Sequence, residues 1–205
     1  LKTARKGVGR FVVRIQGKAA HAGLDPEAGA SAILELSHVI QQLFALNDPE
    51  QGTTVNVGVI DGGLRPNVIA PESSAQVDVR VLTADEGARV ERAIRELQPR
   101  TPNTRIVVEG ALRRPPMEHT PANQALWLQA QELGRQLGLE LEEGTAGGGS
   151  DGNLTSQYTA TLDGLGAVGD GAHAIHEFVQ LDQIPPRCAL LALLLLAEPA
   201  VAEPA

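Results

Sequence analysis

Hydrophobic and polar residues alternate in several segments of the first 112 residues, which is the pattern of half-buried β-strands. In the first of them, Phe11, Val13 and Ile15 fall on one face of the expected strand, while Arg14 and Gln16 fall on the other. The same reasoning, together with runs of β-branched residues, predicts four strands. They cover residues 11–16, 53–60, 75–81 and 104–108.

Two helices are expected between these strands, because hydrophobic residues there recur every three or four positions. The first is expected to open at Asp25-Pro26-Glu27, and in the second Thr83 and Glu86 form a capping box. The resulting order β-α-β-β-α-β is that of a ferredoxin-like domain, with four antiparallel strands and both helices on one face. Its first and last strands are expected to be neighbours, so that its two ends emerge side by side, as in a domain inserted into a host.

The pattern changes after the segment Arg113-Arg114-Pro115-Pro116, and residues 113–198 are expected to form a second domain. A helix is predicted over 122–137, with Leu126, Ala130, Leu133 and Leu137 on one stripe. Short strands are expected at 139–143 and 159–162, with a brief helix between them and a final helix over 181–197. These elements amount to about half of a doubly wound α/β sheet, with too few strands to bury both of its faces. The fold class is therefore α/β (α+β), with a complete domain at 7–112 followed by an incomplete one.

Composition and charge narrow the possible partners. The 205 residues include 2% aromatic residues, so the core must be built from Val, Ile, Leu and Ala. The net charge of −8 argues against a nucleic acid or an anionic membrane as partner. The single cysteine, Cys188, excludes an internal disulfide and a Cys-rich zinc site. The apolar run at 189–197 is far shorter than a membrane span.

The beginning of the sequence bears on localisation. A basic flank, 1–7, is followed by no apolar stretch of the kind found in a signal peptide, and there is no initiator Met. We therefore expect the numbering to begin inside a longer protein. A single reduced cysteine favours the cytoplasm, but the compartment stays open because an export signal could lie upstream.

Histidines stand in two loops. His21 lies among small residues after the first strand, where its ring can project into a cleft or simply remain an exposed imidazole. His173, His176 and Glu177 lie together before the last helix, and imidazoles with a nearby carboxylate are typical of zinc sites. The spacing differs from His-Glu-x-x-His, however, so a plain polar loop stays the alternative.

Three further segments carry candidate binding residues. The glycines at 147–149 lack the Lys-Ser/Thr ending of a phosphate loop and are followed by an acid, so we interpret them as a tight turn before a helix that Ser150 or Asp151 caps. Arg113 and Arg114 precede two prolines in an expected extended linker, where a guanidinium suits a carboxylate or is merely solvated. Asn67 is a turn residue or an amide donor.

Taken together and in order, these motifs resemble the M20 family of zinc-dependent metallopeptidases, and within it the glutamate carboxypeptidases. The resemblance rests on AHAG at 20–23, RPNVIAP at 65–71, DVR at 78–80, GGGSD at 147–151, and GAH at 171–173 followed by EFV at 177–179. It implies a catalytic α/β domain that holds two zinc ions and is interrupted by a ferredoxin-like dimerisation or lid domain, here 7–112. A homodimer through residues 7–112 is therefore expected.

For three residues of the lid domain and for Arg114, which lies just beyond it, the resemblance implies four roles. His21 is the histidine that reaches into the partner subunit's site to stabilise the oxyanion. Asn67 contacts the substrate, and Arg114 binds the free carboxylate of the substrate. Arg80 assists in binding, although it also fits a plain salt bridge within its strand.

In the second domain the resemblance implies that His173 is a zinc ligand and that His176 has no matching role. Gly148 and Gly149 belong to a turn that lines the substrate pocket. The remaining zinc ligands and the general base of the family are not in this sequence, so the chain is expected to be inactive by itself.

Three functions stay open. The first is part of a zinc-dependent exopeptidase or amidohydrolase, which uses metal-activated water to cleave a C-terminal amino acid, possibly glutamate, from an acyl or peptidyl substrate. The second is an N-acyl amino-acid deacylase of the same family, and the third is a non-enzymatic dimerisation module.

Overall fold

The computed structural model describes residues 1–198, which divide into two compact units. One, here called the sheet unit, is Lys6–Pro116. The other, here called the terminal unit, joins Leu1–Arg5 to the chain from Met117 onward.

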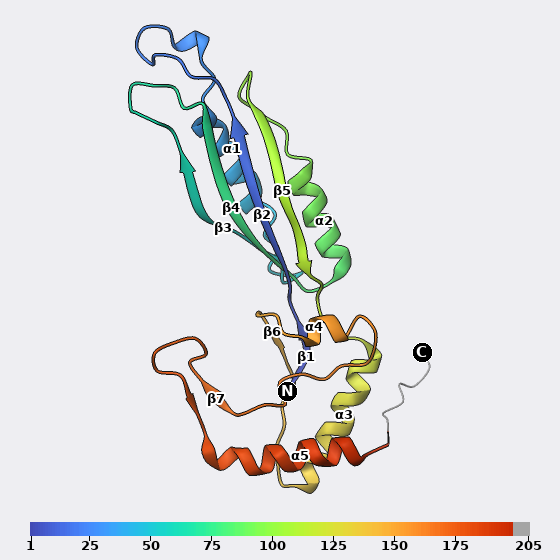
Figure 1. The fold of residues 1–205 in the computed structure, drawn as a ribbon. Helices are drawn as coiled ribbons and strands as arrows, with labels where there is room; N and C mark the ends of the chain where they lie inside the picture. The colour runs from blue at the N-terminus through green and yellow to red at the C-terminus, as the bar shows by residue number, and fades with distance from the viewer. Residues whose placement is uncertain (199–205) are drawn as a thin grey trace. The chain divides into compact units, whose positions relative to one another are not determined.

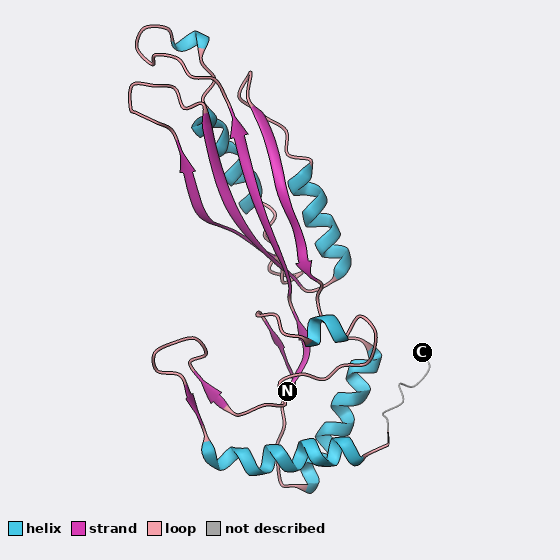
Figure 2. Cartoon of the chain, in the orientation of Figure 1, coloured by secondary structure: helices cyan, strands magenta, loops and turns pink. Residues whose placement is uncertain are grey.

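The sheet unit has the ferredoxin-like order predicted from the sequence (Figure 1). Its four strands are β2 (Gly7–Gln16), β3 (Thr54–Gly62), β4 (Glu72–Val81) and β5 (Arg105–Arg114). They form one antiparallel sheet in the order β3-β4-β2-β5, so the first and last strands are neighbours as expected. Helices α1 (Ala32–Phe44) and α2 (Ala84–Arg95) cover one face of this sheet (Figure 2).

The core of the sheet unit lies between this face and the two helices. Phe11, Val13 and Ile15 are buried, which confirms the predicted inward face of the first strand. Leu43 of α1 and Ile94 of α2 pack into the same cluster. Apart from Phe11, this buried cluster consists of Val, Ile, Leu and Ala, as the aromatic-poor composition requires.

The predicted start of the first helix is wrong. Asp25 precedes only a short 3₁₀ helix, η1 (Pro26–Ala28), and α1 begins at Ala32 with Ser31 as its N-cap. The Ser31 hydroxyl accepts from the backbone N–H of Leu34, and the N–H of Ala32 donates to Ala70 on another loop. The hydrogen bond from Ala32 to Ala70 therefore favours a start of α1 at Ala32, later than Pro26 suggested.

The last strand is longer than predicted and reaches Arg114. Arg113 and Arg114 consequently lie in β5 rather than in an extended linker, and Arg114 pairs with Val8 of β2. The Thr83 cap of α2 is confirmed, since its side chain accepts from the N–H of Glu86. Gly110 of β5 has a φ of +108°, and an added Cβ would overlap the Arg10 carbonyl oxygen.

As far as residue 198, the terminal unit contains three α-helices and two small sheets. The helices are α3 (Pro121–Gln136), α4 (Gly152–Thr155) and α5 (Ile184–Leu196), the last preceded by the 3₁₀ helix η2 (Leu181–Gln183). Strand β1 (Lys2–Arg5) pairs in parallel with β6 (Gly144–Ala146), and β7 (Gly169–Asp170) pairs with β8 (Phe178–Val179). No helix within residues 1–198 is long and apolar enough to cross a membrane.

Both strands expected here from the sequence are misplaced. The predicted strand at 139–143 is wrong, because the strand starts at Gly144, where β1 offers a partner. Residues 159–162 form no strand, and the N–H of Thr161 donates instead to the side chain of Asn123 at 2.7 Å. Strand β1 itself was not predicted, since β6, with which it pairs, lies about 140 residues away in the chain.

Of the stripe expected on the first terminal helix, Ala130 is fully buried, whereas Leu126 and Leu133 are half-buried and Leu137 is exposed. The buried residues of α3 are Asn123, Trp127, Ala130 and Gly134. Asn123 is buried because its side chain satisfies two backbone groups: it donates to Glu118 and accepts from Thr161. In α5, Leu190 is buried, whereas Leu195 and Leu196 are largely exposed.

Candidate functional site

Two of the candidate residues meet at one end of the sheet unit. His21 follows β2 and forms an isolated bridge with Val68, the residue after Asn67. The N–H of Ala22 donates to the carbonyl oxygen of Asn67 at 3.0 Å, and the N–H of Ile69 donates to Ala20 at 2.9 Å. These backbone hydrogen bonds bring the loops of His21 and Asn67 together, although the two residues are far apart in the chain.

The ring of His21 is oriented by its own loop. Its Nδ1 accepts from the backbone N–H groups of Gly23 and Leu24, both at 3.2 Å. A nitrogen that accepts two hydrogen bonds carries no proton, so the proton of the neutral ring lies on Nε2. The side chain is exposed, and Nε2–H is therefore a hydrogen-bond donor available to another molecule.

The other two candidates of this unit lie at the opposite end of the sheet. Val8 pairs with Arg80 on one side and with Arg114 on the other, near the beginning of β2. His21 comes after the end of β2, and a ten-residue strand is about 33 Å long. The four residues therefore form two separate pairs, His21 with Asn67 and Arg80 with Arg114.

The two arginines differ in their partners. Arg80 forms a two-pronged ion pair with Asp78 of its own strand, with Nε–Oδ1 and Nη2–Oδ2 distances of 2.7 and 3.1 Å. This contact matches the strand salt bridge that the sequence left open. Arg114 is half-buried at the end of β5, next to the exposed Arg113.

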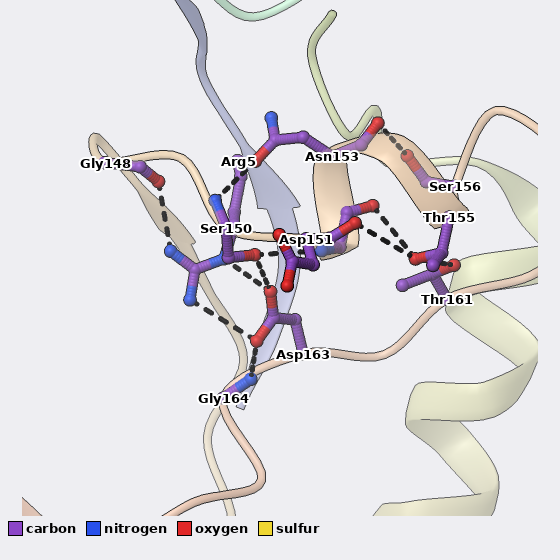
Figure 3. Close-up of polar contacts among 11 residues, drawn as sticks. Arg5, Gly148, Ser150, Asp151, Asn153, Thr155, Ser156, Thr161, Asp163 and Gly164 are labelled. Atoms are coloured by element: carbon purple, nitrogen blue, oxygen red, sulfur yellow. Dashed lines mark hydrogen bonds and ion pairs between the residues drawn. The ribbon is translucent and has the colours of Figure 1, made fainter. Parts of the chain in front are cut away.

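The glycine turn of the terminal unit is held by two residues that sequence reasoning missed (Figure 3). The Arg5 guanidinium donates to the Gly148 carbonyl oxygen from Nη1 at 3.0 Å and to Asp163 Oδ2 from Nε at 2.7 Å. Asp163 also accepts from the Ser150 hydroxyl and from the N–H of Gly164. No motif could have identified Arg5 and Asp163, because they lie 158 positions apart.

The charge of Asp163 is stabilised in place. Burial opposes its ionisation, but the hydrogen bonds from Ser150, Gly164 and Arg5 together lower the pKa of the carboxyl below its ordinary value. The N-cap of α4 is Asp151, whose side chain forms no capping hydrogen bond, while the hydroxyl of Ser150, one residue earlier, accepts from the N–H of Gly152 at 3.1 Å. Gly148 and Gly149 themselves are exposed.

His173 lies at the tip of the β7–β8 hairpin. It is exposed and has a φ of +69°, and its backbone N–H donates to Glu177 Oε2 at 3.2 Å. Within residues 1–198 no three His, Cys, Asp or Glu side chains are grouped so as to hold a metal ion. A protein zinc site takes three or four protein ligands, so the donors of this chain do not by themselves fit the two zinc ions that the resemblance implies.

Residues 3–100 match the family described as the M20 peptidase dimerisation domain. Carboxypeptidase G2 from Pseudomonas sp. (strain RS-16) is 25% identical over 201 residues, which cover 96% of this chain and 48% of that protein. A Haemophilus influenzae homologue of one p-aminobenzoyl-glutamate hydrolase subunit is 39% identical over 69 residues, which cover 33% of this chain and 16% of that protein.

Among solved structures, aminopeptidase PepT from Bacillus cereus superposes with a TM-score of 0.74 at 20% identity, covering 94% of this chain and 52% of that one. This likeness shows a shared fold. The chain spans about half the length of the first curated relatives it matches.

Proposed function

This chain belongs to the M20 peptidases through its dimerisation domain, and from that premise we propose that it supplies the lid and part of the catalytic domain of an exopeptidase or amidohydrolase. The proposed reaction is removal of a C-terminal amino acid from an acyl or peptidyl substrate. The sheet unit is the lid and dimerises with a second copy of itself.

One observation carries this proposal: the two pairs of candidate residues lie at opposite ends of one sheet. Arg114 pairs with Val8 at one end, and His21 lies beyond the other end of the same strand, about 30 Å away. Two groups so far apart cannot contact one small substrate within one subunit. In a symmetric dimer, His21 and Asn67 of one subunit can instead reach the site to which Arg114 of the other belongs.

The chemistry of His21 and Arg114 fits hydrolysis of an amide. The Nε2–H of His21 can donate to the oxygen that becomes negatively charged when the scissile carbonyl is attacked. One such donor typically contributes about 3–4 kcal/mol to transition-state stabilisation. The Arg114 guanidinium suits a carboxylate, which it can bind through two parallel hydrogen bonds. An enzyme that binds the terminal carboxylate of its substrate in this way is an exopeptidase.

Glutamate is the proposed leaving amino acid. One relative is named as a homologue of a p-aminobenzoyl-glutamate hydrolase component, and another as a carboxypeptidase. A deacylase for other N-acyl amino acids has the same requirements, namely a free carboxylate and an amide bond, and it is the second candidate.

We propose His173 as one metal ligand, with the other ligands supplied from outside this sequence. Within residues 1–198 no three side chains are grouped so as to hold a metal ion by themselves. The exposure of Leu195 and Leu196 on α5 supports the same view, since such apolar surface is normally covered by further parts of a domain. The isolated chain is thus proposed to be inactive.

The test compares two substrates in the full-length enzyme that contains this chain: an N-acyl-glutamate and its α-amide, which lacks the terminal carboxylate. We expect hydrolysis of the acid and a clear preference for it over the amide. Arg114→Ala should abolish this preference by raising KM for the acid, whereas Arg113→Ala, at the exposed neighbouring position, should retain it.

A non-enzymatic dimerisation module would hydrolyse neither substrate, and that result would overturn the proposal. His21→Ala distinguishes a role of His21 in the reaction from a role in dimer assembly. Loss of turnover with an intact dimer supports the role of His21 in the reaction, whereas loss of the dimer assigns the residue to assembly.

A further inference from the structure

We propose that Arg5 and Asp163 are positioning residues that set the backbone of the 147–149 turn for substrate binding. This inference rests on the proposed function, because that function places the turn against the substrate. Neither residue belongs to a motif by which the sequence resembles its family. Both residues lie in the terminal unit, beside the turn that they contact (Figure 3).

Arg5 connects the turn to the interior of the unit. Its side chain is 17% exposed, and its guanidinium contacts Asp163 through both Nε at 2.7 Å and Nη2 at 3.4 Å. The remaining nitrogen, Nη1, donates to the Gly148 carbonyl oxygen at 3.0 Å. A planar guanidinium with two of its nitrogens on one carboxylate has little freedom left, so the third nitrogen is fixed in direction.

Asp163 is in turn anchored on its other sides. Its backbone N–H donates to Lys2 and its carbonyl accepts from Lys2, at 3.0 and 2.8 Å, which ties it to β1. Its carboxylate accepts from the Ser150 hydroxyl just after the turn and from the N–H of Gly164. The ion pair between Arg5 and Asp163 is therefore attached both to a strand and to the residue that follows the glycines.

The turn needs such support because its own residues provide little. Around Gly147 and Gly148 an added Cβ would meet no atom within 4 Å, so these glycines border open space. Glycine also loses more conformational freedom on ordering than any other residue. Without an external contact, the backbone of this segment would sample many conformations.

The contact with Gly148 has a directional consequence. The peptide bond is planar and trans, so the carbonyl oxygen of Gly148 and the N–H of Gly149 point in opposite directions. When Arg5 holds the oxygen toward itself, the N–H of Gly149, an exposed residue, is directed away from Arg5. An oriented N–H at this position is suited to bind an oxygen of the substrate.

The first test uses the 205-residue chain and does not depend on activity. Backbone ¹⁵N relaxation measures the order of Gly148 and Gly149 in the wild type and in Arg5→Ala, Arg5→Lys and Asp163→Asn. We expect order parameters of about 0.85 in the wild type and below about 0.6 in Arg5→Ala. Arg5→Lys keeps the charge but cannot contact Asp163 and Gly148 together, so it should also loosen the turn while preserving the fold.

Arg135→Ala serves as the matched control, because Arg135 pairs with Glu132 on the surface of α3 and should leave the turn unchanged. Unchanged order of Gly148 and Gly149 in folded Arg5→Lys and Asp163→Asn would overturn the proposal, whether or not Arg5→Ala folds.

The second test measures steady-state kinetics of the full-length enzyme. We expect Arg5→Lys and Asp163→Asn to raise KM roughly tenfold with a smaller change in kcat, as for the loss of an oriented hydrogen-bond donor. A loosened turn with unchanged KM would overturn the link to substrate binding. Failure of the wild-type enzyme to hydrolyse either substrate would instead overturn the proposed function, and the relaxation data would still decide whether Arg5 and Asp163 order the turn.

Discussion

The backbone N–H of Ala22 donates a hydrogen bond to the carbonyl oxygen of Asn67, with an N–O distance of 3.0 Å. This hydrogen bond joins the loop after β2 to the loop between β3 and β4, and it places the neighbouring His21 at the same end of the sheet as Asn67. Because the contact is made by the backbone, the side chains of both candidate residues remain exposed.

Asn67→Ala should therefore impair function without weakening the fold. The backbone hydrogen bond is retained, so the free energy of unfolding should change by less than about 0.5 kcal/mol. If the Asn67 amide contacts the substrate, kcat/KM of the full-length enzyme should fall about tenfold. Arg65→Ala, at an exposed position of the same loop, is the control, and an equal loss in both variants would contradict the specific role of Asn67.

The core of the sheet unit predicts a contrast within one helix. Leu43 of α1 is fully buried, whereas Leu34 on the same helix is 50% exposed. Leu43→Ala leaves a cavity and should lower the free energy of unfolding by about 2–5 kcal/mol, while Leu34→Ala should cost much less. Urea unfolding followed by circular dichroism measures both, and similar losses would show that the burial assigned to α1 is wrong.

Stability should depend on Glu86 at acidic pH. The hydrogen bonds from Arg89, joined by the one from Thr53, outweigh burial and lower the pKa of this carboxyl below its ordinary value of 4.5. A group whose pKa is lowered by folding stabilises the fold above about pH 4.5 and loses this contribution as the pH falls through its pKa in the folded state.

Glu86→Gln should accordingly be less stable than the wild type at pH 6 and should lose less stability between pH 5 and about pH 3. Urea midpoints across this range provide the measurement. Glu96→Gln, exposed just after the same helix, should retain the wild-type slope. A Glu86→Gln chain with the full wild-type slope would assign the acid sensitivity to other groups.

Gly110 is expected to tolerate no side chain. Its φ of +108° and its closeness to the Arg10 carbonyl oxygen mean that Gly110→Ala must distort β5, at a cost of about 1–3 kcal/mol or more. At Gly58 the nearest atom to an added Cβ is a side-chain nitrogen at 3.4 Å, so Gly58→Ala is the control. Equal thermal midpoints for the two variants would contradict this account of the strand.

The fold of the sheet unit could be predicted because its strands show their two-residue period locally. Val13 and Ile15 are buried as expected, and the order of strands and helices follows from successive changes of period. The start of α1 could not be predicted, because Pro26 and Ser31 are both plausible helix starts. Hydrogen bonds from Ala32 to Ala70 and from Ser73 to Ala32 favour the second.

The terminal unit was harder to predict because its strands depend on distant partners. Strand β6 is only three residues long, and it pairs with β1, which comes from the other end of the sequence. The contact between Arg5 and Asp163 could not be predicted for the same reason, because the two residues are far apart in the sequence. Motifs identified the candidates His21, Asn67 and the glycine turn, but no local pattern indicates which distant side chains hold them in place.

Complementation between two inactive variants tests the central claim, that each site uses residues of both subunits. His21→Ala and His173→Ala forms of the full-length enzyme would be dissociated, mixed and allowed to form hybrid dimers, with hybrid formation verified by native mass spectrometry. We predict recovery of about a quarter of the wild-type activity, because half of randomly mixed dimers are hybrids and each hybrid has one intact site of two. Activity of verified hybrids no greater than that of the separate variants would contradict the claim.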